Sequence, residues 1–200
     1  MTTLNLDEMP QYAFISEEEY FSLEEKAVIR HEYYEGEIFA MAGGSHEHAV
    51  LMANTSGAVV PRLRGQKCYT ASSEQRIKVE ATGLITYPDL AIVCPPLRFA
   101  GKNTHTLLNP RAIFEILSPS TSQYDKTIKF ANVKEIDEMT DYILIEQDSV
   151  GIEHRYRDDD GLWQSRIHDS LDDMLRLAGL DLEIPLSEIY ERLTFLPEII

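Results

Sequence analysis

The chain has 200 residues, of which 44% are apolar, and its 18 basic and 34 acidic side chains give a net charge of −16. This size and composition predict one globular domain over residues 1–200, and no apolar run of about 18 residues could form a membrane span. The negative charge argues against general nucleic-acid affinity, which requires Lys and Arg to neutralise phosphates. It leaves room for a local basic strip or for an acidic site that binds cations.

The N-terminal stretch MTTLNLDEMP has no basic segment followed by an apolar one, so we expect no secretory signal. Cys68 and Cys94 are the only cysteines, and their spacing matches neither a metal-binding nor a redox motif. We therefore expect a cytoplasmic protein in which both thiols are reduced and buried as small core residues.

The first third of the chain predicts two helices around a hairpin. Ser16 and Glu19 have the spacing of a capping box, which predicts a short helix that ends near Ala27. Aromatic residues and isoleucine follow, and they predict a strand or a hairpin that turns near Gly36. A second helix is predicted over residues 46–63.

The middle of the chain predicts short strands followed by one helix. We expect an extended segment over residues 67–79, strands over 89–94 and 112–117 with a loop from 95 to 110 between them, and a helix over 123–136.

The last third predicts mostly strands. DYILIEQD is an apolar strand, and VGIEHRYRDDDGLWQSRIHD is a hairpin with an Asp-Gly turn. The tail predicts one more strand near Leu180 and a helix from Ser187 to Leu193, with Ser187 as N-cap. This order of elements predicts an α+β or mixed α/β fold.

Two acidic residues belong to predicted buried strands. Asp89 stands at the start of one strand and Glu115 lies within the other, so the two carboxylates approach each other if the strands are neighbours. Close carboxylates repel, and one protonates unless a cation lies between them; hard divalent cations, Mg²⁺ above all, prefer such ligands. The alternative is that both acids are solvated at strand ends.

The motifs around these acids resemble a known family, the Uma family of putative restriction endonucleases in the PD-(D/E)XK nuclease-like superfamily. The strings that carry the resemblance are EYYEGEIFAMAGGSHEH, YPDLAIV, AIFEILSPSTSQYDKTIKF, DYILIEQD and EIPLSEIYERL. The resemblance implies a restriction-endonuclease-like core, with a central mixed β-sheet flanked by helices and an added C-terminal β-hairpin.

The resemblance also implies a metal site. Asp89 matches the acid of the "PD" motif, Glu115 matches the second acid, and both would bind Mg²⁺ together with the carbonyl of Ile116, with Mn²⁺ as a possible substitute. Superfamily members usually carry a lysine two residues after the second acid. This chain has Leu117 there, which can neither orient a water nor stabilise charge.

The family resembled carries its lysine on the next helix, in an Asp-x-x-x-Lys spacing. Here those residues are Asp125 and Lys129, and a spacing of four puts both on one helix face. Lys129 is the candidate replacement for the missing lysine, and Lys126 is the alternative. An exposed Asp-Lys ion pair, worth less than about 1 kcal/mol, would look the same in the sequence.

Two further residues match family positions. Glu37 could complete the metal site, or it could be an ordinary acid at a strand end. His48 could contact phosphate or act as an acid or base, because imidazole titrates near neutral pH, or it could be structural.

The resemblance thus implies a metal-dependent endonuclease that hydrolyses DNA phosphodiester bonds, with Asp89, Glu115, Lys129, Glu37 and His48 as catalytic candidates. Alternatives are an inactive binding or accessory module with a nuclease-like fold, and a nuclease acting on RNA or small nucleotides. RLRGQK, residues 62–67, with Arg76 and Lys78, could form a basic strip facing DNA or could be simply solvated. We also expect a homodimer, in which the hairpin around Asp160-Gly161 pairs with a second subunit.

Overall fold

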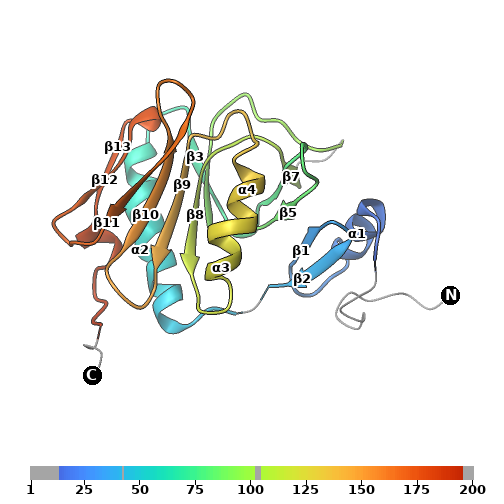
Figure 1. Cartoon of the computed structure of the whole chain (residues 1–200), viewed down its shortest axis with the longest axis horizontal. Helices are drawn as coiled ribbons and strands as arrows, with labels where there is room; N and C mark the ends of the chain where they lie inside the picture. Colours follow the sequence, from blue (N-terminus) through green and yellow to red (C-terminus); the bar gives the residue numbers. More distant parts are fainter. Residues whose placement is uncertain (1–13, 42, 102–104, 196–200) are drawn as a thin grey trace.

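A computed structural model describes residues 14–41, 43–101 and 105–195 and shows two β-sheets, a small ribbon and two helical layers (Figure 1). The larger sheet has the strand order β11-β10-β9-β8-β6-β3. Its strands β8 and β9 are parallel, and the other neighbours are antiparallel. Its strands are β3 (Tyr69–Ser72), β6 (Leu90–Val93), β8 (Pro110–Leu117), β9 (Asp141–Glu146), β10 (Ile152–Arg157) and β11 (Trp163–His168).

The second sheet has the order β2-β1-β5-β4-β7, and β12 pairs with β13 in a separate ribbon. The strands of the second sheet are β1 (His31–Tyr34), β2 (Glu37–Ala40), β4 (Arg76–Lys78), β5 (Ile85–Thr86) and β7 (Thr106–Leu107). The ribbon is formed by β12 (Met174–Leu177) and β13 (Leu182–Pro185).

The helices cover both faces of the larger sheet. They are α1 (Glu17–Glu24), α2 (His46–Leu63), α3 (Ser122–Tyr124), the π-helical turn η2 (Asp125–Lys129), α4 (Phe130–Val133), the 3-10 turn η3 (Ala178–Leu180) and α5 (Leu186–Ile189). Figure 1 shows α2 on one face of the larger sheet, and α3 with α4 on the other. The hairpin β1–β2 and α1 lie together at one end of the molecule.

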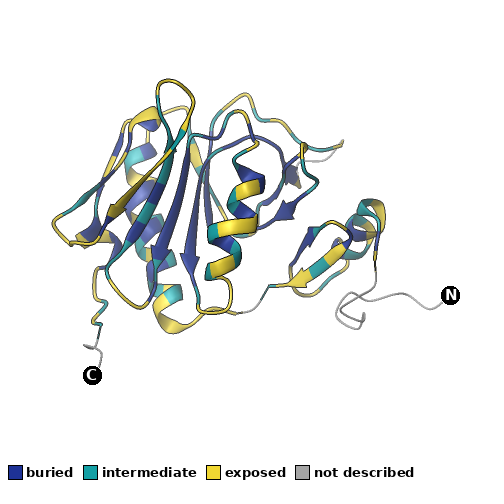
Figure 2. Cartoon of the chain, in the orientation of Figure 1, coloured by how far each residue is buried: buried dark blue, intermediate teal, exposed yellow. Residues whose placement is uncertain are grey.

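The alternation of side chains along each central strand supplies both faces with apolar residues, and Figure 2 shows the central strands buried. On β6, Leu90 belongs to the core cluster that includes Leu51 and Val59 of α2. The next residue, Ala91, belongs to the cluster that includes Val133 of α4. The central strands are thus buried on both sides, so a polar side chain on either face is costly unless it has a partner.

The predicted fold class is confirmed: the fold is mixed α+β, with a central mixed sheet flanked by helices and a late hairpin, β10–β11. The predicted second helix has the predicted bounds, residues 46–63. The capping box is also present, since Ser16 Oγ accepts a hydrogen bond from Glu19 N and the Glu19 side chain accepts one from Ser16 N.

Several predicted elements were wrong in detail. The first helix ends at Glu24, before Ala27. The segment 67–79 divides between two sheets as β3 and β4, and the loop 95–110 contains β7. The helix predicted over 123–136 contains a π turn and ends at Val133.

The tail was also predicted incompletely. It holds the two strands of the ribbon instead of one strand near Leu180. The last helix starts at Leu186, with Pro185 as N-cap, so Ser187 lies inside the helix and does not cap it.

The prediction of two reduced cysteines is contradicted by a disulfide between Cys68 and Cys94. The physical reason is strand register: Tyr69 faces Val93 across the β3–β6 pair, so the next two residues outward, Cys68 and Cys94, face each other. Their Cα atoms are 4.2 Å apart, and both residues are only partly buried. A separation of 26 residues gives no hint of this contact in the sequence.

Within the described ranges, no helix is both long enough and apolar enough to cross a membrane. The N-terminal residues on which the expectation of no secretory signal depends lie outside those ranges.

Candidate active site

The acidic residues of the two central strands are neighbours. Strands β6 and β8 pair antiparallel with Leu90 opposite Phe114, so the preceding residue Asp89 lies beside Glu115 at the end of the pair. Because Leu90 and Phe114 face α2, Asp89 and Glu115 face the side covered by α3, η2 and α4.

Asp89 has two hydrogen-bonding neighbours. Its Oδ2 accepts a hydrogen bond of 2.7 Å from the backbone N–H of Ile116. The same oxygen lies 3.3 Å from Nε2 of His48, at the start of α2. Asp89 thus connects the ends of β6 and β8 to the N-terminus of α2. Its side chain remains 16% exposed, so solvent and ligands can reach it.

The second acid, Glu115, is buried and contacts Lys129. The Lys129 Nζ lies 2.8 Å from Glu115 Oε1, 3.1 Å from Glu32 Oε1 and 3.6 Å from Asp125 Oδ1. The Asp125–Lys129 contact confirms that a spacing of four puts both side chains on one helix face. We call Glu32, Asp89, Glu115, Asp125 and Lys129 the acidic cluster.

The π turn η2 contributes two of these residues, and both are buried. Such turns, with one extra residue per turn, occur mostly as single turns and often at functional sites. Tyr142 of β9 lies beneath the turn, and its hydroxyl donates a 3.0 Å hydrogen bond to the Asp125 carbonyl. The helix therefore holds the Lys129 ammonium against the sheet at the position of the strand acids.

Glu32 is a member of the cluster that the sequence did not indicate. It lies on β1, and its Oε1 accepts hydrogen bonds from the Thr86 hydroxyl and, at 3.4 Å, from the Tyr87 N–H. The contacts depend on the pairing of β1 with β5, where Tyr33 faces Ile85. No local pattern in the sequence predicts that long-range register.

The predicted acid Glu37 lies elsewhere. It is an exposed residue of β2, opposite Tyr34 and next to the tight turn at Gly36. Among the described residues it has no ion pair or hydrogen bond with the acidic cluster. Leu117, at the usual lysine position, is buried in the apolar core against the α4 side.

Burial and repulsion shift the pKa values in the cluster. Burial raises the pKa of Glu115 well above its usual range, with further repulsion from Asp125 and Asp89, and burial likewise raises the pKa of Asp125. Burial favours the neutral amine of Lys129, but the carboxylates of Glu115, Glu32 and Asp125 outweigh it and raise the pKa of Lys129 well above its usual value. The ammonium therefore stays charged.

His48 is held by the start of α2. Ser45 Oγ accepts a 3.1 Å hydrogen bond from the His48 N–H and so caps the helix. Gly44 leaves room for the ring, because a Cβ there would lie 2.7 Å from His48 Nδ1. The hydrogen bond to Asp89 raises the pKa of His48 above its usual value, against the opposing effect of burial.

The proposed basic strip does not form one free surface. Arg62 makes a bidentate ion pair with Glu188, and Lys78 pairs with Glu17. Arg76 is buried, with its guanidinium 4.7 Å from the centre of the Phe21 ring. These three cations are matched by groups of the protein itself, whereas Arg64 and Lys67 are exposed and have no ion pair among the described residues.

The donor chemistry of the cluster suits a hard divalent cation. Among the described residues, Asp89 Oδ1 has no hydrogen-bond partner, and the buried Glu115 Oε1 has none either, although the Lys129 Nζ lies 2.8 Å from it. Each acid therefore has an oxygen whose hydrogen-bonding capacity the protein leaves unused. In the same part of the chain, no three His, Cys, Asp or Glu side chains are arranged to hold a metal ion. Mg²⁺ usually takes only one or two carboxylates and completes its shell with waters and substrate phosphates, so a pair of acids is sufficient.

Comparison with known proteins gives a family match over most of the chain. The Uma2 family, described as "Putative restriction endonuclease", matches residues 17–187. The uncharacterized protein slr1290 of Synechocystis sp. is 34% identical over 181 residues, which cover 90% of this chain and 94% of that protein. A second Synechocystis protein, sll1609, is 29% identical over 145 residues, which cover 72% of this chain and 82% of that protein.

A solved structure shares the fold. It is the crystal structure described as a putative nuclease belonging to DUF820 from Anabaena variabilis, with a TM-score of 0.73 at 18% identity, covering 88% of this chain and 97% of that chain. The family match spans all five residues of the acidic cluster. The chain therefore belongs to the Uma2 family, whose description is "Putative restriction endonuclease".

Proposed function

We propose that the protein is a Mg²⁺-dependent endonuclease that hydrolyses phosphodiester bonds of DNA at the acidic cluster. The observation that carries the proposal is the placement of Asp89 beside Glu115 across β6 and β8, with the Lys129 ammonium 2.8 Å from Glu115. Asp89, Glu115 and the carbonyl of Ile116 would hold the metal, and Mn²⁺ can substitute because it accepts the same oxygen ligands.

The charge balance of the site supports a divalent ion. Four carboxylates, from Glu32, Asp89, Glu115 and Asp125, face the cationic groups of Lys129 and, when protonated, His48. Two negative charges remain without a partner, and burial makes such an excess costly. A divalent cation, or protons taken up by Glu115 and Asp125, would neutralise them.

When bound, Mg²⁺ supplies a water of lowered pKa and neutralises charge on the phosphate. Lys129 is the group of this chain that can orient that water or stabilise the charge developing on phosphate oxygens, because its ammonium is fixed and desolvated. His48 holds Asp89 at the edge of the cluster that solvent reaches, where a protonated imidazole can contact phosphate.

DNA is the proposed substrate, and a homodimer the proposed assembly, since two related sites suit the two strands of a duplex. The acidic surface favours local contacts at the site over general attraction to the nucleic-acid backbone.

The proposal is tested with wild-type protein and an Asp89→Asn/Glu115→Gln double variant. Mn²⁺ binding is measured by calorimetry, and cleavage is measured on duplex DNA, single-stranded DNA and RNA. We expect Mn²⁺ binding and duplex cleavage by the wild type alone. Mn²⁺ binding without cleavage of any substrate would instead indicate an inactive binding module. Cleavage of RNA alone would show that the substrate is RNA and not DNA.

A further inference from the structure

A cavity lies at the end of the central strands opposite to the acidic cluster. It has a volume of about 350 Å³, within the range of small-molecule sites. Cys94, which follows β6, and Arg111, near the start of β8, line it, whereas Asp89 and Glu115 lie at the opposite ends of these strands. The four residue-to-residue steps of extended strand from Arg111 to Glu115 span about 13 Å. The cavity is therefore separate from the acidic cluster.

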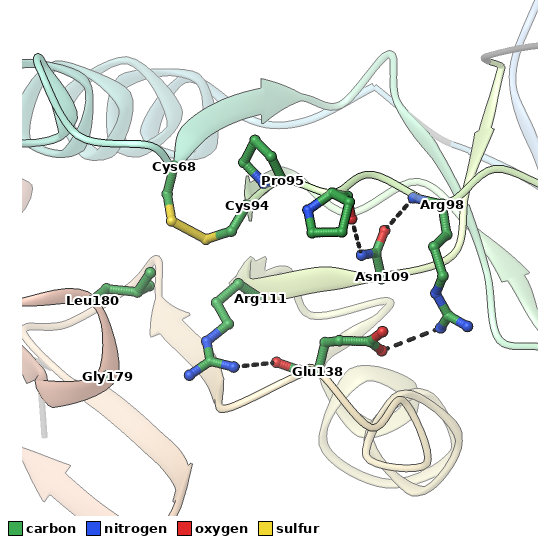
Figure 3. Close-up of a pocket in the computed structure, with 10 residues that line it drawn as sticks. Cys68, Cys94, Pro95, Arg98, Asn109, Arg111, Glu138, Gly179 and Leu180 are labelled. Atoms are coloured by element: carbon green, nitrogen blue, oxygen red, sulfur yellow. Dashed lines mark hydrogen bonds and ion pairs between the residues drawn. A yellow bond between two sulfur atoms is a disulfide. The ribbon is translucent and has the colours of Figure 1, made fainter.

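The Cys68–Cys94 disulfide forms one wall of this cavity (Figure 3). Both cysteines are partly exposed and lie at the end of the β3–β6 pair, where β3 is the edge strand of the sheet. A disulfide that opens into a cavity of this size can be reached by a small thiol. Fully buried structural disulfides cannot be attacked in this way, because access is one of the factors that set the exchange rate.

Arg111 supplies a positive charge to the cavity without an acidic partner. Its Nη1 donates a 3.1 Å hydrogen bond to the carbonyl of Glu138, and among the described residues no carboxylate oxygen lies within 4.0 Å of its guanidinium. Arg98, in contrast, pairs with the Glu138 carboxylate at 3.2 Å. An unmatched, half-buried arginine in a chain of net charge −16 is available for an anionic ligand.

Gly179 makes room for that guanidinium. A Cβ at residue 179 would lie 3.3 Å from Arg111 Nη2, closer than ordinary van der Waals contact. Figure 3 shows the disulfide at one side of the cavity, with the Arg111 guanidinium extending away from it. A ligand that engages both groups therefore needs a sulfur and an anionic group at separate positions on one small molecule.

We propose that this cavity is a thiol–disulfide exchange site for a small thiol that carries a carboxylate. The carboxylate binds Arg111, and the thiolate attacks one sulfur of the Cys68–Cys94 disulfide. The positive charge of Arg111 raises the local concentration of the anionic thiol.

The exchange balances in two steps. In the first, the small thiolate forms a mixed disulfide with one cysteine while the S–S bond breaks and the other cysteine leaves as a thiolate. In the second, another molecule of the same thiol attacks the mixed disulfide, which releases a small symmetric disulfide. Two small thiols are oxidised, the protein disulfide is reduced to two thiols, and the thiol protons pass to the two cysteines.

The test measures the rate at which free thiols appear in the native full-length chain. The probes are glutathione, which carries carboxylates, the neutral 2-mercaptoethanol and the cationic cysteamine, all at low ionic strength. We expect Arg111→Gln to slow reduction by glutathione about tenfold and to leave the rate with 2-mercaptoethanol within about twofold. Cysteamine should react at least as fast with the variant as with the wild type.

Two further variants keep the test decisive. Gly179→Ala leaves Arg111 in place but crowds it, and should slow glutathione selectively even if Arg111→Gln folds poorly. Arg176→Gln, which changes an exposed arginine on β12, should alter no rate. Equal rates for glutathione in all these proteins, or no reduction of the native wild type by millimolar glutathione, would overturn the proposal.

Discussion

Lys129 is the residue on which the buried charges of the site depend. Only 4% of its side chain is exposed, and it is the one cation within 4.0 Å of Glu115, Glu32 or Asp125 among the described residues. The family resemblance indicated this lysine, and its spacing of four from Asp125 predicted only that the two side chains share a helix face. It could not predict Glu32, which reaches the cluster only through the pairing of β1 with β5.

Replacing Lys129 should both destabilise the protein and abolish cleavage. In Lys129→Met the three carboxylates lose their buried cation, and removal of one partner from a buried ion pair costs about 3–5 kcal/mol. Chemical denaturation measures this loss. Lys126→Met is the matched control, because Lys126 pairs with Glu146 at a partly exposed position and should cost less than about 1 kcal/mol. Equal loss in the two variants would contradict the role given to Lys129.

A second comparison at the residue scale separates Glu32 from Glu37. Glu32 positions Lys129 at 3.1 Å, whereas Glu37 is exposed on β2. We expect Glu32→Gln to lower the cleavage rate about 10- to 100-fold, the usual effect of removing a residue that positions a catalytic group. Glu37→Gln should retain the wild-type rate. A large loss of cleavage rate in Glu37→Gln with none in Glu32→Gln would instead indicate that Glu37 acts in the site.

At the scale of elements, local sequence signals predicted helices and caps well. The pairing of strands that are far apart in the chain could not be predicted from such signals. The capping box at Ser16 and the apolar pattern of α2 depend on neighbouring residues, and both predictions were confirmed. The division of residues 67–79 between two sheets, and the disulfide at the β3–β6 pair, depend on partners far along the chain. Strand alternation predicted the approach of Asp89 and Glu115 only if the two strands were neighbours, and the family resemblance indicated that they are.

The β10–β11 hairpin contains a histidine that should make stability depend on pH. Burial lowers the pKa of His168 below its ordinary 6.5, and the neighbouring His154 adds to this. Among the other charged groups near His168, Asp173 raises its pKa, while Arg166 and Arg176 lower that pKa further. Because the unfolded chain takes up the proton first, stability should fall as the pH drops below 6.5 toward the pKa of the folded state.

Thermal unfolding at a series of pH values measures this effect. His168→Gln should flatten the loss of stability below pH 6.5 relative to the wild type, and the exposed control His46→Gln should leave the profile as it is. An unchanged profile in His168→Gln would show that the histidine does not titrate differently on folding.

At the scale of the whole molecule, β11 is an edge strand of the larger sheet and exposes apolar side chains. On the strand Ile167 is 64% exposed, and Leu162, the residue just before the strand, is 62% exposed. Proteins usually protect such edges with charges or a covering segment. We therefore predict a dimer in solution, with a mass by light scattering of twice the chain's 22.8 kDa. Ile167→Lys should give the single-chain mass, and a monomeric wild type would contradict the prediction.

The central claim is that the acidic cluster hydrolyses DNA with a divalent ion, and the most direct measurement is the conversion of supercoiled plasmid. Wild-type protein and Asp89→Asn/Glu115→Gln are incubated at low salt with Mg²⁺, with Mn²⁺ and with chelator. We predict nicked or linear plasmid only with the wild type and only with metal. Equal conversion by both proteins, or none by the wild type with either metal, would contradict the claim.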